Sequence, residues 1–511
     1  MSQAQSVTAE RDRSEGTPVR LRHVPNAVSA MVLFAARLLV AVVQLRYVDR
    51  YWGGAFTGLN ALSNQVLLYV TLLELGLSQS AITLLYEPIL RRDHGRVSGL
   101  IAALRHDVRL LAVSGAVVVF PGLWIYARFI HGGLPFFTVA LTLSCIAAAG
   151  LLQLSAIQFQ VYLNAAERLD KVNYTFSAGF LLKTSIGLPL AIHFHQYLWL
   201  PGTIALLTVG EVIALRLAFH REFPHFRATS WREQAAKLRS RAKYALIQRI
   251  AGVAYYQSDF IILSITTSLV SVRDYAKFQY VAAALLSAVG LIAASLTTTV
   301  ARLQISQQAE DRRGQYVAAQ FAICLIAAVA MLAFWFTSRT VVGLAFGRDP
   351  AVERYVVILF GIALFLNMVK IVDDVFIMAK GRFEIGYWIP AVEVPCYVAS
   401  GVFLSQRMGF AGILLASIGT NLFVSVVLKG IVLARPIFDS TSSQWYGARF
   451  GNVFKALLAA APVAAAYSLG ARFLHPSLLR FGATNLFALA YIFMGLRLIL
   501  PPTLWRPKPA V

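Results

Sequence analysis

Residues Leu110–Ile130 read LLAVSGAVVVFPGLWIYARFI and carry a single charge, Arg128. A helix needs about 20 mostly apolar residues to cross the hydrocarbon of a bilayer. Ala27–Leu45, Ala245–Thr266 and Ala318–Phe336 are runs of the same kind. Similar runs follow one another almost to the end of the chain, so the sequence predicts an integral membrane protein that crosses the bilayer many times.

Composition agrees with this interpretation and excludes a nucleic-acid-binding protein. Of the 511 residues, 58% are hydrophobic and 14% are charged, whereas about a quarter are charged in a soluble domain. The formal net charge is +22, but the charges lie in clusters between apolar runs and not on one soluble face. Lys and Arg collect in this way on the cytoplasmic side of membrane proteins.

The pattern predicts an all-α polytopic membrane protein with about 14 transmembrane helices. The bias of short-loop Lys and Arg places both termini in the cytoplasm. The most basic connector, 220–243, is either an ordinary cytoplasmic loop or a short helix held on the inner leaflet by anionic membrane lipids. The predicted parts are an N-terminal tail (1–26), a six-helix bundle (27–219), the basic linker (220–243), a second six-helix bundle (244–434), two further transmembrane helices (452–500) and a C-terminal tail (501–511).

Several predicted spans carry charged side chains, which cost several kcal/mol at this depth unless they face a cavity or a partner. We predict that four cations line a hydrated cavity and bind substrate: Arg37, Lys183, Arg249 and Lys370. We also predict that polar residues of the spans line the cavity or couple ions, with Asp373 pointing about 100° away from Asp374 on its helix; they are Asn64, Glu74, Gln153, Tyr256, Asp259, Asp373, Asp374 and Glu393.

Two alternatives stay open for these stripes. Polar side chains also join transmembrane helices at packing interfaces, and Lys370 and Asp374, four residues apart, have the spacing of a neutralising pair. Glu74 and Asp259 are either proton carriers or members of structural ion pairs with an arginine. The sequence has no phosphate-binding Gly-Lys-Ser/Thr loop and no His-Glu-x-x-His motif, so no metal and no cofactor is expected.

Six stretches resemble the bacterial Wzx-type polysaccharide flippases of the multidrug/oligosaccharidyl-lipid/polysaccharide exporter superfamily. They are Arg46-Tyr-Val-Asp-Arg-Tyr-Trp-Gly-Gly, Leu73-Glu-Leu-Gly-Leu-Ser, Phe159-Gln-Val-Tyr-Leu-Asn-Ala-Ala-Glu-Arg, Asp259-Phe-Ile-Ile-Leu with Val272-Arg-Asp-Tyr-Ala, and Gly409-Phe-Ala-Gly-Ile-Leu-Leu-Ala. Glu74 stands where members of the family often have Asp. The resemblance implies a MATE-like fold, in which two six-helix bundles surround a central cavity.

The resemblance also implies a function: a polyprenyl-diphosphate-linked oligosaccharide is flipped from the inner to the outer leaflet of the bacterial cytoplasmic membrane by alternating access. Its expected partners are the lipid-linked substrate, membrane lipids, and the polysaccharide polymerase and chain-length machinery. One alternative is an ion-coupled drug or metabolite exporter of the same superfamily. Another is a membrane glycan polymerase or ligase, but the longest predicted outer loop, 338–351, is too short to build an enzyme site.

Overall fold

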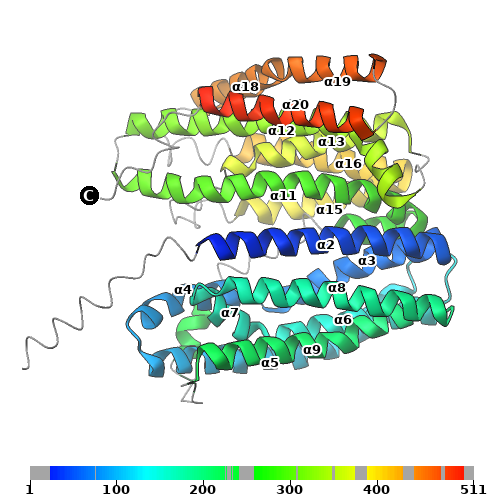
Figure 1. Cartoon of the computed structure of the whole chain (residues 1–511), viewed down its shortest axis with the longest axis vertical. Coiled ribbons are helices and arrows are strands. Elements are labelled where there is room, and N and C mark those ends of the chain that lie inside the picture. The colour runs from blue at the N-terminus through cyan, green and yellow to red at the C-terminus, as the bar shows by residue number, and fades with distance from the viewer. Residues whose placement is uncertain are drawn as a thin grey trace, which may run out of the picture. The chain divides into compact units, whose positions relative to one another are not determined.

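The computed structural model describes residues 23–74, 76–224, 226, 232, 234–240, 258–306, 309–347, 352–373, 388–429, 442–473 and 478–499. These residues form helices joined by short connections, and none of them forms a strand (Figure 1). Eight of the described helices are long and apolar enough to cross a bilayer, and three shorter apolar helices accompany them. The predicted all-helical membrane fold is confirmed, while the total of about 14 spans stays a prediction.

The chain divides into two compact units. The first contains residues 1–41, 73–120 and 144–245, and the second contains 42–72, 121–143 and 246–511. Three helices, α2 (His23–Tyr51), α5 (His94–Ala127) and α6 (Phe136–Ser155), each begin in one unit and end in the other. The two units are therefore interleaved along the chain.

The first unit is built mainly from α4 (Leu77–Leu90), α7 (Ile157–Ala165), α8 (Leu169–His193) and α9 (Trp199–Glu222), with parts of α2, α5 and α6. Figure 1 shows α8 and α9 running beside each other, and they form an extensive interface. A buried apolar cluster joins α4, α5, α7 and α9; it includes Leu85, Leu104, Leu163, Leu215 and Phe219.

The second unit contains α3 (Gly54–Thr71), α11 (Leu269–Ser306), α12 (Ala309–Phe346), α13 (Arg354–Val369), α15 (Trp388–Met408), α16 (Phe410–Thr420) and the π-helical segment η4 (Asn421–Leu428). It ends with α18 (Ser442–Ala459), α19 (Ala461–Phe473) and α20 (Leu478–Ile499). Both α18 and α20 pack against α12 (Figure 1). A close approach joins α3 to α11: a Cβ atom on Gly58 would lie 1.8 Å from the carbonyl oxygen of Leu269.

Two of the predicted spans are broken in the structure. The predicted span 56–84 consists of α3, the 3-10 turn η2 (Leu72–Glu74) and α4, because Gly76 adopts a left-handed conformation with φ of 70°. The predicted span 135–162 is divided at Ala156 into α6 and α7. The first break separates two residues placed on one stripe by the sequence, since Asn64 belongs to the second unit and Glu74 to the first.

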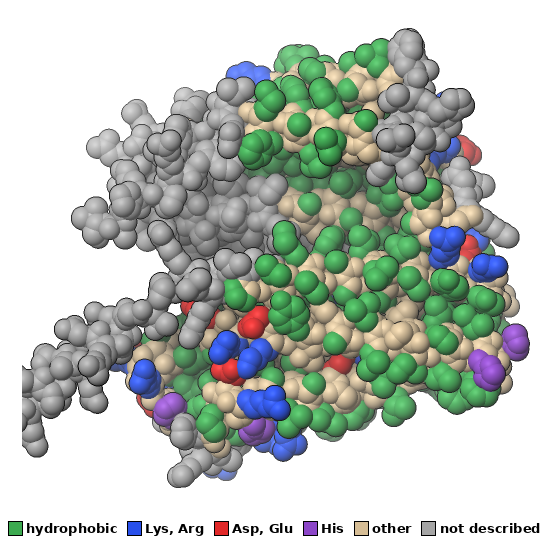
Figure 2. Space-filling model, in the orientation of Figure 1, with side chains coloured by type: hydrophobic (Ala, Val, Ile, Leu, Met, Phe, Trp, Pro, Cys, Tyr) green, Lys and Arg blue, Asp and Glu red, His purple; other side chains and the backbone are tan. Residues whose placement is uncertain are grey.

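The long helices expose apolar side chains, as membrane-spanning helices do towards lipid. Leu110, Val113 and Val117 on α5 and Leu206 and Ile213 on α9 are all more than half exposed. Figure 2 shows hydrophobic side chains spread over the visible helices, while charged side chains gather towards the helix ends. Exposing these apolar side chains to water would be unfavourable, whereas the hydrocarbon of a bilayer is an apolar surrounding in which they are stable.

Candidate functional site

The first unit contains a cluster of charged and aromatic side chains within its membrane-spanning helices. The Lys183 ammonium on α8 lies 2.6 Å from Oε2 of Glu211 on α9, and both side chains are about 5% exposed. The same oxygen accepts a hydrogen bond of 3.2 Å from Nε2 of Gln153 on α6. Lys183 is therefore neutralised by an acid on the neighbouring helix, and the predicted site residue Gln153 is joined to it.

Glycine at position 179 makes this pairing possible. A Cβ atom on Gly179 would lie 1.7 Å from Oε1 of Glu211. Any larger residue there would push the carboxylate away from α8. The close packing of α8 against α9 and the ion pair between them thus depend on the same small residue.

Arg37 on α2 is the second cation of the cluster. Its guanidinium lies 5.3 Å from the ring centroid of Phe180, and Lys183 Nζ lies 5.9 Å from the same ring. Arg37 is exposed and has no ion pair with any described acidic residue. We call these five residues, Arg37, Gln153, Phe180, Lys183 and Glu211, the Arg37 cluster. It keeps one positive charge that the described residues do not neutralise.

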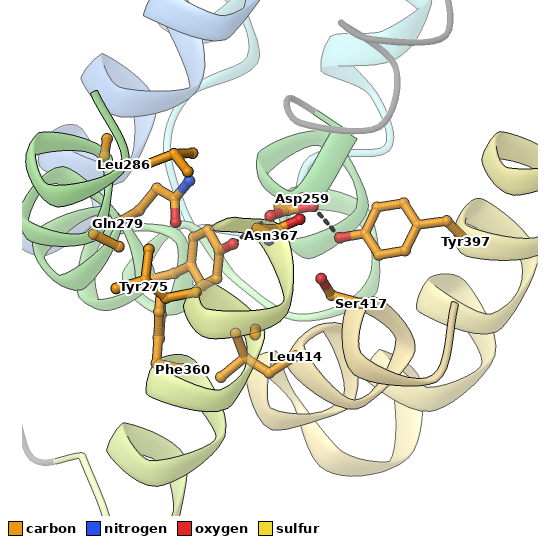
Figure 3. A pocket seen from close by; sticks show the side chains of 13 residues that line it. Asp259, Tyr275, Gln279, Leu286, Phe360, Asn367, Tyr397, Leu414 and Ser417 are labelled. Atoms are coloured by element: carbon orange, nitrogen blue, oxygen red, sulfur yellow. Dashed lines mark hydrogen bonds between the residues drawn. The ribbon is translucent and has the colours of Figure 1, made fainter. Parts of the chain in front are cut away.

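The second unit has a recess built around Asp259 (Figure 3). The recess has a volume of about 500 Å³, including the part open to solvent. The buried Asp259 carboxylate accepts hydrogen bonds from the hydroxyl groups of Tyr275 on α11 and Tyr397 on α15. The side chains of Asn367 and Ser417 also line it, so the wall presents oxygen and amide groups around one carboxylate.

The remaining predicted residues of the second unit belong to two other buried contacts. Lys370 Nζ lies 3.3 Å from Oε1 of Glu393, and both side chains are at most 10% exposed. Asp373 pairs with the buried Arg449 on α18 and accepts a 2.8 Å hydrogen bond from the Tyr316 hydroxyl. The Asp373 pair joins α18 to the segment that follows α13, and the Tyr316 hydrogen bond links the same carboxylate to α12.

Two further predicted residues have polar neighbours of their own. The Ser78 hydroxyl donates a hydrogen bond to the buried Glu74, and the hydroxyl of Tyr280 is hydrogen-bonded to Asn64. Three other predicted site residues lie outside the described residues: Arg249, Tyr256 and Asp374.

Sequence reasoning missed the acids and bases that complete these contacts. Glu211 is the sole acidic residue of the predicted span 197–219, and a buried lysine on the preceding span requires such a partner. That rule would have found it. The same rule could not identify Arg449, because the sequence predicted that this residue lies in a loop outside the membrane.

Solved structures show which known proteins share this fold. A comparison with protein family profiles finds no match, and a comparison with curated protein sequences finds none either. A structure described as lipid II flippase MurJ in an inward closed conformation superposes with a TM-score of 0.66 at 13% identity, covering 94% of this chain and 100% of that one.

Multidrug transporters have the same fold. An inward-facing multidrug resistance MATE family transporter of the MOP superfamily gives a TM-score of 0.66 at 12% identity, covering 85% of this chain and 99% of that one. A MATE transporter in the bent conformation gives 0.56 at 12% identity, covering 86% of this chain and 96% of that one. The chain therefore has the fold of MOP-superfamily transporters, and the predicted MATE-like architecture is confirmed at the level of fold class.

Proposed function

We propose that this protein flips a polyprenyl-diphosphate-linked oligosaccharide from the inner to the outer leaflet of the bacterial cytoplasmic membrane. The observation that carries the proposal is Arg37, an arginine within a membrane-spanning helix that no described acid neutralises. A charge at this depth is retained where it faces a hydrated pathway or a polar ligand. The fold is shared with a structure named as a lipid II flippase, which supports the same class of cargo.

The chemistry of such a substrate matches the Arg37 cluster. The diphosphate and the sugars do not enter hydrocarbon unaided, and a guanidinium binds phosphate oxygens through paired, charge-assisted hydrogen bonds. Because Lys183 is already paired with Glu211, Arg37 is the member that carries the diphosphate in this proposal. Lys183, held by Glu211, lies 5.9 Å from the same Phe180 ring that Arg37 approaches at 5.3 Å.

Energy for the movement comes from the membrane potential in this account. Moving a negative charge out of a cell that is negative inside is favourable by about 2.3 kcal/mol per charge per 100 mV. Alternating access of the two halves exposes the substrate first to one side and then to the other. The lipid-linked product then becomes available to the polymerase and chain-length machinery at the outer face.

A second candidate, an ion-coupled exporter of small organic molecules, has its own supporting observation. The recess around Asp259 presents one carboxylate among hydroxyl and amide groups, which suits a cationic group better than a diphosphate. The fold shared with MATE transporters supports this candidate equally.

Reconstituted liposomes separate the two candidates and test Arg37. We expect wild-type protein to translocate a fluorescent polyprenyl-diphosphate oligosaccharide and Arg37→Ala to slow it by about tenfold or more, since a hydrogen bond to a charged group contributes about 1.5–3 kcal/mol. Arg407→Ala is the matched control, because Arg407 lies 4.3 Å from the Phe403 ring near the end of α15. Equal rates for Arg37→Ala and wild type would remove Arg37 from the proposal; efflux of organic cations without lipid translocation would favour the exporter.

A further inference from the structure

Three arginines lie together on the first unit, away from the Arg37 cluster. Arg105 and Arg109 belong to α5 and Arg216 belongs to α9. The positive charges of Arg109 and Arg216 are near enough to repel the positive charge of Arg105. The helices are joined here by the buried apolar cluster, which includes Leu104 and Val108 of α5 and Leu215 and Phe219 of α9. These neighbours place the arginines near one another, on two helices that contribute to the same apolar cluster.

The positive charge of this group is not neutralised by the described part of the chain. Asp107 is the acidic residue nearest in sequence to Arg105 and Arg109, and both of its oxygens are taken by Arg239, at 2.9 and 2.5 Å. Among the described residues, no acid pairs with the three arginines, and the buried Nε of Arg105 has no hydrogen-bond partner. A buried donor left unmatched is costly, so an anionic acceptor bound at this place would be stabilised.

The arginines lie where the apolar surface of both helices ends. On α5 the exposed large apolar side chains begin at Leu110, directly after Arg109. On α9 they run to Leu217, directly after Arg216. The group therefore lies at the level where hydrocarbon gives way to lipid headgroups, on the side of the bilayer that the basic-residue bias assigns to the cytoplasm.

We propose that Arg105, Arg109 and Arg216 bind the phosphate of an anionic membrane phospholipid of the inner leaflet. Basic pockets between transmembrane helices at the cytoplasmic level suit such headgroups. The exposed Leu110 and Leu217 beside the arginines provide an apolar surface for the acyl chains. In this proposal the exposed Arg109 and Arg216 contact the headgroup from the sides, and the half-buried Arg105 contacts it from below. The site is independent of the proposed flipping function.

Native mass spectrometry of the full chain in detergent tests this site, with phosphatidylglycerol as the anionic probe and phosphatidylcholine as the neutral one. The site variant is Arg105→Gln with Arg109→Gln and Arg216→Gln. A control variant loses the same charge elsewhere on the predicted cytoplasmic side: Arg91→Gln with Arg92→Gln and Arg96→Gln. We expect wild type and the control to retain one phosphatidylglycerol, and the site variant to lose at least about tenfold in its affinity, because each basic contact contributes about 1 kcal/mol.

Other outcomes have defined meanings. Equal losses in the site and control variants would show general surface attraction and overturn the site. Equal binding of phosphatidylcholine, or preference of the site for a polyprenyl diphosphate over phosphatidylglycerol, would overturn the assignment of its ligand. Arg105→Lys with Arg109→Lys and Arg216→Lys guards against misfolding, since it keeps the charge and is expected to keep most of the binding.

Discussion

The buried ion pair between Lys183 and Glu211 allows a quantitative test of the Arg37 cluster. Lys183→Met removes the ammonium with little change in volume and leaves the 4% exposed Glu211 side chain with only the Gln153 amide among the described hydrogen-bond donors. Breaking a buried ion pair on one side costs about 3–5 kcal/mol. Glu211→Met is expected to cost a similar amount, because it leaves the ammonium unpaired.

The double variant Lys183→Met with Glu211→Met is the critical comparison. Two well-packed apolar side chains replace the pair, so the double variant is expected to recover to within about 1–2 kcal/mol of wild type. Unfolding entropy of about 2.1 cal/mol/K per residue predicts a loss of about 1 °C in Tm per kcal/mol for a chain of 511 residues. Each single variant is therefore expected to lose about 3–5 °C in a fluorescence melt in detergent.

Additive losses of stability in this double-mutant cycle would contradict the ion pair between Lys183 and Glu211. If the double variant loses the sum of both single effects, the two charges do not interact and the pairing across α8 and α9 is wrong. The Arg37 cluster as described would then have to be abandoned, while the helical fold would not be affected.

Three other predictions follow from particular contacts. Gly179→Ala is expected to destabilise the protein by about 1–3 kcal/mol, because the new Cβ atom would collide with the Glu211 side chain. The control Gly210→Ala has open space around its Cβ atom and is expected to leave stability unchanged. Equal Tm values for the two variants would contradict the close approach of Gly179 to Glu211. Arg449→Met leaves the fully buried Asp373 carboxylate without its cation, so we expect a loss of about 3–5 kcal/mol and faster proteolysis near α18; unchanged cleavage would count against the pair. Asp259→Asn is expected to abolish any stimulation of transport by a pH gradient in liposomes, and an unchanged response would remove Asp259 as a proton carrier.

The fold class could be predicted from the sequence because hydrocarbon requires long apolar helices, and their length and order are visible in the residues. The helix breaks at Gly76 and Ala156 were missed because the polar residues near each boundary, such as Glu74 and Gln153, were assigned to stripes of continuous helices. A glycine can adopt positive φ and interrupt a helix, but its presence in a span does not show that it does so. The polar stripe drawn through Asn64 and Glu74 was therefore divided between the two units.

The candidate site could be predicted only as a set of side chains. Helical phase identified Gln153, and its charge within an apolar span identified Lys183. Their common partner Glu211 lies on another helix, and one sequence does not say which helices pack together. The same holds for Asp259, whose partners Tyr275 and Tyr397 come from separate helices. Arg37 differs, because the described residues provide no acid to neutralise it.

The most direct test of the account compares two cargoes in the same wild-type proteoliposomes. One assay follows a fluorescent polyprenyl-diphosphate oligosaccharide as it becomes accessible at the outer leaflet, with a potassium gradient setting the membrane potential; the other follows efflux of an organic cation. The account predicts translocation of the anionic lipid, accelerated when the inside is negative, and no cation efflux. Cation efflux without lipid translocation would contradict it.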